Sequence, residues 1–383
     1  MKVKLTELCD IQYGYAFDST NFTEDNTYIP LVRIRDVKRG YSETFYTGEY
    51  SEEYILNTGD LLVGMDGEFN IARWKSGQAL LNQRVCKITA KNGTNEEYLR
   101  FALSKALKEI ENRTAFVTVK HLSAKELNKL ELDVPDYGAQ VNVAESLVRI
   151  ETIIALRQQE LQKLDELIKA RFVEMFGDPL FNSLGLKTLP MTEVCEIIDG
   201  DRGKNYPTAD EFSDEGYCLF LNAKNVTASG FNFDNCMYIT KEKDEALRKG
   251  RLSRGDVVLT TRGTLGNLAF YTDEVPFEHV RINSGMVILR MKKDIIDESF
   301  FIEQFRMQLN DIKVKIASGS AQPQLPISTM NKIQILIPDI DKQREFATFV
   351  KQLDKSKVVI QKALEEARLL FDSLMQQYFR WGK

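Results

Sequence analysis

Residues 5–11 read Leu-Thr-Glu-Leu-Cys-Asp-Ile, and residues 191–197 read Met-Thr-Glu-Val-Cys-Glu-Ile. Thr, Glu, Cys and Ile recur at the same places, and the other three changes are conservative. The two copies lie 186 residues apart, far more than the roughly 20–50 residues of a solenoid repeat. The chain is therefore predicted to contain a duplicated domain, which gives the protein two similar faces.

The sequence similarity between the two copies continues along the whole chain. It joins residues 59–62 to 255–258, residues 128–135 to 331–338, and Gln140 to Gln343. The offset between the copies grows from 186 at Thr6 and Thr192 to 203 at Pro135 and Pro338, so the second copy carries 17 more residues. We expect these extra residues in loops, where binding specificity usually lies. The two faces are therefore predicted to recognise different things.

Each copy is predicted to begin with a mixed α+β domain. Short apolar or alternating segments bounded by Gly, Asn and Asp are typical of strands. They lie at residues 28–34, 60–63, 84–88, 256–260 and 286–289. Residues 95–103 and 297–305 start with a capping residue and acids, which predicts a helix in each copy.

Each copy is predicted to end with one long helix of roughly 50 Å. Apolar residues there follow one another in alternating steps of three and four, as in a coiled coil. The seam is predicted to contain Leu147, Ile150, Ile154, Leu161, Leu164 and Ile168 in the first helix, and Leu353, Ile360, Leu370 and Leu374 in the second. A helix this long cannot bury its apolar stripe against its own small domain, so we expect the two helices to pair antiparallel.

The predicted fold class is α+β: two tandem mixed domains joined by two long helices, with an internal pseudo-twofold axis. The predicted limits are 1–136 for the first domain, 137–177 for the first helix and 178–186 for a linker. The second domain is predicted at 187–340 and the second helix at 341–380.

Composition bounds the class of protein. The 383 residues are 43% hydrophobic and 28% charged, as in an ordinary globular protein. We expect a cytoplasmic protein, because no apolar run resembles a signal peptide or a membrane span and the five cysteines include no CxxC pair. The formal net charge of −5 counts against a free-standing nucleic-acid binder. Local basic patches or partner subunits can still supply a positive field.

The chain shows no motif for catalysis or cofactor binding. Residues 200–205 lack the spacing and the hydroxyl residue of a P-loop. Residues 263–266 form a lone GxxG, which more often marks a tight turn than a phosphate or RNA clamp. The two histidines are far apart, no nucleophile elbow is present, and no metal site is expected. We therefore predict a protein that binds a partner molecule and does not catalyse a reaction.

Several polar side chains are candidate contacts to nucleic acid, since Arg can pair with guanine and Asn with adenine in the major groove. Residues 31–40 read as a basic strand-to-turn stretch, and residues 221–226 stand at the equivalent place. The candidates are Arg33, Arg35, Lys38, Arg73, Arg84, Lys120 and His121 in the first domain, and Asn222, Lys224, Arg262, Thr264, Gln322 and Gln324 in the second. For each of them, an ordinary solvated surface position is the alternative.

Taken together, the chain resembles the specificity subunit of a type I restriction–modification system. The residues that carry the resemblance are 59–62 and 255–258, the tracts 117–123 and 319–325, and the prolines followed by Gln140 and Gln343. No single motif is very specific, but their duplicated order covers essentially the whole chain.

The resemblance implies a sequence-specific subunit for double-stranded DNA that has no catalytic activity and no cofactor of its own. Each target-recognition domain would read one half of a split, asymmetric target, and the coiled coil would set the spacer. The helices would dock two methyltransferase subunits, which use S-adenosylmethionine, and motor–nuclease subunits would join for cleavage. The alternative is a coiled-coil scaffold that presents two peptide- or protein-binding domains. A fused nuclease–methyltransferase is disfavoured by the missing motifs.

Overall fold

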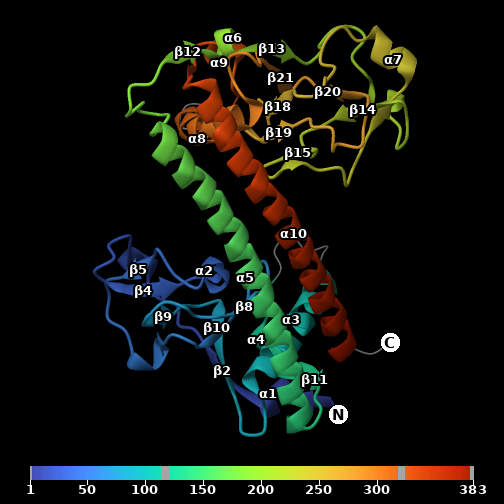
Figure 1. Ribbon diagram of the computed structural model, residues 1–383. Coiled ribbons are helices and arrows are strands. Elements are labelled where there is room, and N and C mark those ends of the chain that lie inside the picture. Colours follow the sequence, from blue (N-terminus) through green and yellow to red (C-terminus); the bar gives the residue numbers. More distant parts are fainter. Residues whose placement is uncertain (1, 114–120, 318–323, 380–383) are drawn as a thin grey trace. The chain divides into compact units, whose positions relative to one another are not determined.

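The computed structural model describes residues 2–113, 121–317 and 324–379. The chain forms two compact units, Met1–Gln158 with Gln361–Lys383, and Gln159–Ile360. Figure 1 shows that each unit contains sheets, short helices and part of both long helices. The predicted domain limits stay a prediction, since each long helix contributes residues to both units.

The first unit is built on two larger sheets and a two-stranded sheet of β1 and β11. A four-stranded antiparallel sheet has the order β2-β10-β7-β8, and a five-stranded sheet has the order β3-β5-β4-β9-β6, in which β4 and β9 are parallel. The strands are β1 (Lys2–Lys4), β2 (Cys9–Tyr13), β3 (Phe22–Thr23), β4 (Ile29–Val32), β5 (Phe45–Tyr46), β6 (Ile55–Leu56), β7 (Leu61–Gly64), β8 (Ile71–Arg73), β9 (Ala79–Leu81), β10 (Val85–Ala90) and β11 (Glu131–Asp133). The helices are α1 (Leu5–Leu8), η1 (Ser19–Asn21), α2 (Ile34–Arg39), η2 (Glu52–Tyr54), α3 (Glu96–Arg113) and α4 (Ala124–Lys129).

The second unit repeats this plan. Its sheets have the orders β13-β21-β18-β19 and β17-β14-β20, and β14 and β20 are again parallel. The strands are β12 (Thr188–Pro190), β13 (Cys195–Asp199), β14 (Cys218–Leu221), β15 (Val226–Thr227), β16 (Gly230–Phe231), β17 (Tyr238–Ile239), β18 (Val257–Thr260), β19 (Leu268–Phe270), β20 (Val280–Ile282), β21 (Met286–Met291) and β22 (Gln334–Leu336). The helices are α6 (Met191–Val194), η3 (Ala209–Glu211), α7 (Lys241–Ala246), α8 (Glu298–Ala317) and α9 (Ile327–Met330).

The duplication extends to strand register. Cys9 pairs across the sheet with Ala90, and Cys195 pairs with Met291 at the equivalent place. Both cysteines are buried, and burial raises the pKa of each thiol to about 12. They serve as small core residues, and the predicted α+β class with its internal repeat is confirmed.

One predicted element is wrong. The strand expected at 28–34 ends at Val32, and residues 34–39 form helix α2 instead of a turn. The Asp36 carboxylate accepts the Arg33 N–H at 2.9 Å, which satisfies the first turn, and Gly40 at φ 78° ends the helix in the left-handed conformation. The sequence prediction gave the basic residues of this stretch more weight than these capping signals.

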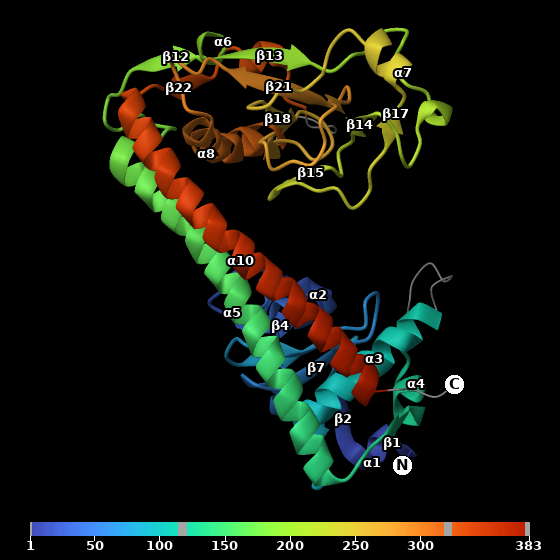
Figure 2. The same ribbon diagram turned by 45° about the vertical axis from the view of Figure 1, so that its right-hand side comes forward.

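The two predicted long helices are present as α5 (Tyr137–Phe176) and α10 (Ile340–Tyr378). Gly177, at φ 74°, ends α5 as the sequence predicted. The helices lie side by side in Figures 1 and 2. Within the second unit, Lys357 Nζ lies 2.7 Å from Asp165, and the Phe172 and Phe346 rings meet edge to face at 5.4 Å. These pairs run in opposite directions along the two helices, so the packing is antiparallel.

The side chains predicted for the seam differ in their burial. Leu147, Ile150 and Ile168 are buried, and the other seam residues of the two helices are partly buried, namely Ile154, Leu161, Leu164, Leu353, Ile360 and Leu374. Leu370 is 51% exposed, and Phe371 packs into the core of the first unit in its place. The helix period of 3.6 residues drifts against a strict heptad, which moves the buried face by one position near the end of α10.

Candidate nucleic-acid interface

Three polar side chains of the first unit meet at one corner of its four-stranded sheet. They are Asp66, in the turn after β7, Arg84, in the turn before β10, and His121, ahead of α4. Asp66 pairs with the His121 ring, and Arg84 Nη1 lies 3.1 Å from His121 Nε2. Arg84 Nε lies 3.6 Å from the Asp66 carboxylate. We call these three residues the first corner.

Backbone hydrogen bonds fix the first corner. The Leu122 N–H donates to Met65 O at 2.7 Å, and the Met65 N–H donates to Arg84 O at 2.8 Å. The three segments are thereby held in register although they are distant in sequence. Lys38 on α2 adds a cation nearby, because its Nζ lies 3.7 Å from Glu68 in the same turn as Asp66. The structure therefore brings Lys38, Arg84 and His121 together, as candidate nucleic-acid contacts require.

The second unit has the equivalent corner, formed by Arg262 and Gln324. Arg262 and Gln324 form an isolated bridge, as Asp66 and His121 do in the first unit. Thr264 belongs to the same turn, which Gly263 and Gly266 shape with φ of 71° and 80°. We call Arg262, Thr264 and Gln324 the second corner; all three are exposed.

The loop with Asn222 and Lys224 lies beside the second corner. Asn267, at the end of that turn, donates from Nδ2 to Val226 O at 3.0 Å and so joins the two loops. Part of the Asn222 side chain is used internally, because its Oδ1 accepts the Lys224 N–H. The Lys224 side chain is exposed.

Arg33 and Arg35 lie elsewhere in the first unit, at an open pocket of about 730 Å³. Its lining combines the two arginines with hydroxyl, acidic and aromatic side chains, among them Thr44, Glu43 and Phe45. Arg35 Nη2 donates to Thr44 Oγ1 at 3.3 Å. The two arginines share this pocket with Glu24 and Glu43, so the charges of its lining balance.

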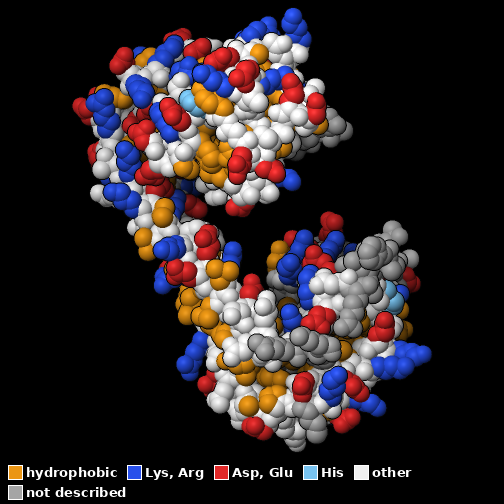
Figure 3. All heavy atoms as spheres, turned by 90° about the vertical axis from the view of Figure 1, so that its right-hand side faces the viewer, with side chains coloured by type: hydrophobic (Ala, Val, Ile, Leu, Met, Phe, Trp, Pro, Cys, Tyr) orange, Lys and Arg blue, Asp and Glu red, His pale blue; other side chains and the backbone are white. Residues whose placement is uncertain are grey.

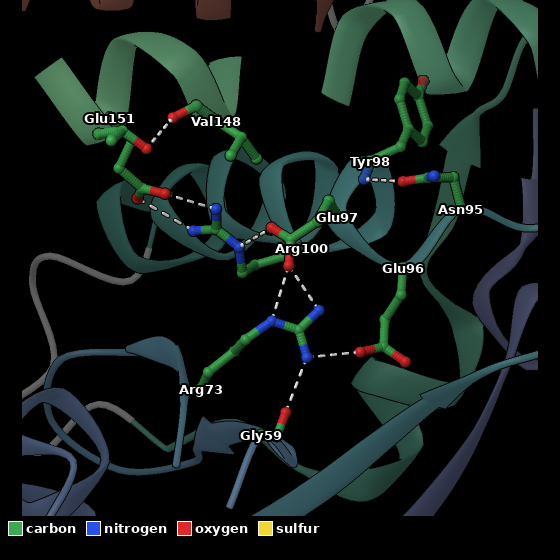
Figure 4. A network of polar contacts seen from close by, with 10 residues as sticks. Gly59, Arg73, Asn95, Glu96, Glu97, Tyr98, Arg100, Val148 and Glu151 are labelled. Carbon is green, nitrogen blue, oxygen red and sulfur yellow. Dashed lines mark hydrogen bonds and ion pairs between the residues drawn. The ribbon is translucent and has the colours of Figure 1, made fainter. Parts of the chain in front are cut away.

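Arg73 leaves the set of candidate contacts. Figure 4 shows its guanidinium between α3 and the Gly59 carbonyl, which it reaches at 2.7 Å. The same guanidinium pairs with Glu96 at 2.7 Å and with Glu97. Sequence analysis could not foresee this, because the two glutamates lie more than twenty residues away on another element.

The same network ties α3 to α5 within the first unit. Arg100 reaches Glu97 at 2.7 Å and holds Glu151 of α5 with two hydrogen bonds, of 2.6 and 3.1 Å (Figure 4). A bidentate pair of this kind fixes orientation as well as distance. Arg73 therefore fixes α3 against the four-stranded sheet, and Arg100 fixes α3 against α5.

Sequence analysis missed the two acids at the first corner, Asp66 and Glu68. The repeat contained a signal for Asp66, because Asp66-Gly67 occupies the same register as Arg262-Gly263. Lys120 and Gln322, two further candidates, lie outside the described residues. Within residues 2–113, 121–317 and 324–379, no group of His, Cys, Asp and Glu could hold a metal ion. No helix in this part of the chain is long and apolar enough to cross a membrane.

The chain is thus a duplicated α+β protein on paired long helices, with an exposed polar corner in each copy. The family model for the type I restriction modification DNA specificity domain matches residues 1–166 and 185–367. The chain belongs to this family, and it is the DNA specificity subunit of a type I restriction–modification system. Such subunits are not catalytic and carry no cofactor, and S-adenosylmethionine is used by the methyltransferase partner.

Two curated relatives are similar over most of their length. The specificity subunit of the type I restriction enzyme EcoBI from Escherichia coli is 25% identical, over 99% of this chain and 85% of the relative. The specificity subunit of the type I restriction enzyme MjaVIII from Methanocaldococcus jannaschii is 21% identical, over 90% of this chain and 80% of the relative.

Two solved structures share the fold. The specificity subunit from M. genitalium matches 100% of this chain and 96% of its own, with a TM-score of 0.60 and 16% identity. A chain from a study of complex assembly and conformational transition in a type I system matches 99% of this chain and 97% of its own, with a TM-score of 0.51 and 16% identity. The family that the sequence predicted is confirmed.

Proposed function

We propose that the protein reads a bipartite, asymmetric DNA target, with one half-site for each unit. The observation that carries this proposal is the pair of equivalent corners. They occupy the same place in the duplicated fold but present different side chains, Asp66, Arg84 and His121 in one and Arg262, Thr264 and Gln324 in the other. Identical corners would suit a palindrome, whereas different corners suit two different half-sites.

The nearby cations fit the same role. Lys38 and Lys224 stand beside the two corners and are exposed, so they are available to phosphates of the duplex. Phosphate contacts position a protein on DNA, and base contacts specify the sequence. We assign Arg33, Arg35 and Lys120 to the first half-site as well, and Gln322 to the second.

The partners of the proposed complex are two methyltransferase subunits docked on the long helices, together with motor–nuclease subunits for cleavage. The long helices carry apolar side chains that their own units leave exposed. They are Ile153, Leu156, Leu167 and Val173 on α5, and Val358, Val359, Leu369 and Leu370 on α10. Figure 3 shows hydrophobic surface of this kind between charged side chains on the long helices. Large contiguous patches of exposed apolar surface on a folded protein mark interaction sites.

The complex accounts for the acidic net charge. A chain with a net charge of −5 binds DNA weakly by itself, because affinity for the duplex comes largely from cations at phosphates. Partner subunits that close around the duplex would supply the remaining positive charge.

The test is a methylome of cells that carry this chain with its methyltransferase. We expect one bipartite adenine motif with two different halves. An active complex without such a motif would contradict the proposal. Binding of the complex to DNA should also weaken steeply with salt through counterion release. Salt-independent binding would instead favour a scaffold that presents two protein-binding domains.

A further inference from the structure

Arg84 adopts a backbone conformation that its side chain disfavours. Its φ is 70°, in the left-handed region. It is the third residue of a turn closed by a hydrogen bond of 3.2 Å from the Val85 N–H to Asn82 O. A residue with a Cβ is strained there, and turns that need positive φ at this place normally use glycine or asparagine.

The equivalent turn of the second unit has a different, unstrained backbone conformation at its third position. The Met286 N–H donates to Asn283 O at 3.3 Å, and the third position is Gly285, whose φ lies outside the left-handed region. Strained residues that persist in a fold often belong to binding sites, where the surroundings hold them in place. The strain is therefore specific to the first unit and to an arginine.

The contacts of Arg84 involve Nε and Nη1 of its guanidinium and leave the side chain half exposed. Nε faces the Asp66 carboxylate at 3.6 Å, and Nη1 faces the His121 ring at 3.1 Å. The Arg84 side chain is still 50% exposed. A planar fork fixed in this way is ordered before a ligand arrives, which lowers the entropy cost of binding.

The charges around Arg84 favour a base over a phosphate. Asp66 contacts Arg84, and Glu68 lies in the same turn. Two carboxylates repel a phosphate group, which carries a full negative charge, more strongly than the uncharged edge of a base. Guanine presents two acceptors, O6 and N7, in the major groove, and they match the donors of an arginine fork.

The second unit also has an arginine at the equivalent corner, but there the other of the two facing turns supplies it. Arg262 stands where the first unit has Asp66, and Gly285 stands where it has Arg84. A Cβ on Gly285 would lie 3.9 Å from the Cβ of Arg262. Each corner therefore holds one arginine, supplied by a different turn.

Resting on the proposed DNA recognition, we propose that Arg84 determines specificity for one guanine of the first unit's half-site, with Asp66 and His121 as the positioning residues. The strained backbone aims the guanidinium, and the carboxylate and the imidazole hold it. Arg262, which is exposed at the equivalent corner, contacts the other half-site.

The test compares Arg84→Ala, Arg84→Gly and Arg84→Lys in the complete complex with its methyltransferase. The methylome should show that all three variants lose selectivity, by about 10-fold to 100-fold, at one base pair of one half-site. The other half-site should stay unchanged. The lysine variant keeps the charge but not the fork, so it separates base reading from simple attraction.

Thermal unfolding of the same variants tests the strain. Arg84→Gly should melt roughly 2–4 °C above Arg84→Ala, because both lose the guanidinium but only glycine accepts the left-handed backbone freely. Equal melting temperatures would overturn the claim that strain aims the side chain.

The outcomes separate this inference from the proposed function. A wild-type bipartite motif that all three variants leave intact would overturn the role of Arg84 and leave DNA recognition standing. Full selectivity in Arg84→Lys would overturn the bidentate reading. An active wild-type complex with no bipartite motif would overturn the proposed function and, with it, this inference.

Discussion

At the scale of single residues, the duplicated glutamines show how the repeat builds its helix entrances. Gln343 is fully buried; its Oε1 accepts the Asp297 N–H at 2.9 Å, and its Nε2 donates to Pro338 O at 2.9 Å and to Ile295 O at 3.2 Å. Gln140 makes the same three contacts, with Asn95, Pro135 and Gly93. Each glutamine thus joins the start of a long helix to the start of the shorter helix that packs on it.

Replacing Gln343 by alanine should destabilise the second unit by about 2–4 kcal/mol, because buried backbone groups lose their partners. Urea unfolding of the variant measures this. Gln352→Ala, on the exposed face of the same helix, is the matched control and should change stability by less than about 0.5 kcal/mol. A similar loss of stability in both variants would show that the hydrogen bonds of Gln343 do not stabilise the second unit.

Asp201 should make stability depend on pH. Its carboxylate accepts the Gly203 N–H and the Arg248 N–H, both at 2.7 Å, and these bonds lower its pKa to about 2. Because its pKa is lowered in the folded state, Asp201 contributes about 1–2 kcal/mol to the free energy of unfolding. This contribution is complete above pH 4 and disappears as the pH falls toward 2. The urea midpoint of Asp201→Asn should therefore lie below that of the wild type at pH 6, and the gap should close between pH 4 and pH 2. A gap that stays constant over this range would contradict the assignment.

At the scale of elements, each long helix serves two units and two purposes. The first part of α5 packs with the last part of α10 in the core of the first unit, and the remaining parts pack in the second. Buried and exposed apolar residues alternate along the same helix. Near the end of α10, Leu370 faces outward, while the next residue, Phe371, meets Phe101 with ring centroids 5.9 Å apart. One face holds the fold, and the other carries exposed apolar side chains.

This division gives a prediction for two adjacent residues. Leu370→Ser should unfold like the wild type but co-purify less methyltransferase. Phe371→Ala should cost about 2–4 kcal/mol of stability, since it removes a ring packed against the core. Denaturation and affinity co-purification, measured on both variants, check the pair. Loss of stability in Leu370→Ser, with normal partner binding, would place Leu370 in the seam after all.

At the scale of the whole molecule, the two recognition units have separate hydrophobic cores. Among the described residues, the buried clusters of one unit share no member with those of the other. We therefore expect the two half-sites to be read independently, as distant sites usually contribute additively.

Arg262→Ala should relax only the half-site that the second unit reads, by about 1–3 kcal/mol at one base pair. The methylome of the complex measures this directly. Arg84→Ala is the matched control for the other half-site, and the double variant should relax both positions additively. Relaxation of both half-sites by Arg262→Ala alone would contradict independent reading.

The sequence by itself determined the duplicated α+β plan, the two long helices and most of their seam. Repetition and periodicity are local patterns, and neither depends on distant contacts. The sequence also supplied the prediction that the copies differ in their loops, because the offset grows between Thr6 and Pro135.

Only the tertiary structure decided which polar residues stand together. Arg73 and Arg84 look alike in sequence, yet one is held by Glu96 and Glu97 on α3 and the other stands half exposed at a corner. The helix over residues 34–39 and the outward turn of Leu370 also came from the structure. The physical reason is the same in each case. The neighbours that settle a side chain's role lie far away in sequence, and the fold alone brings them within a few ångströms.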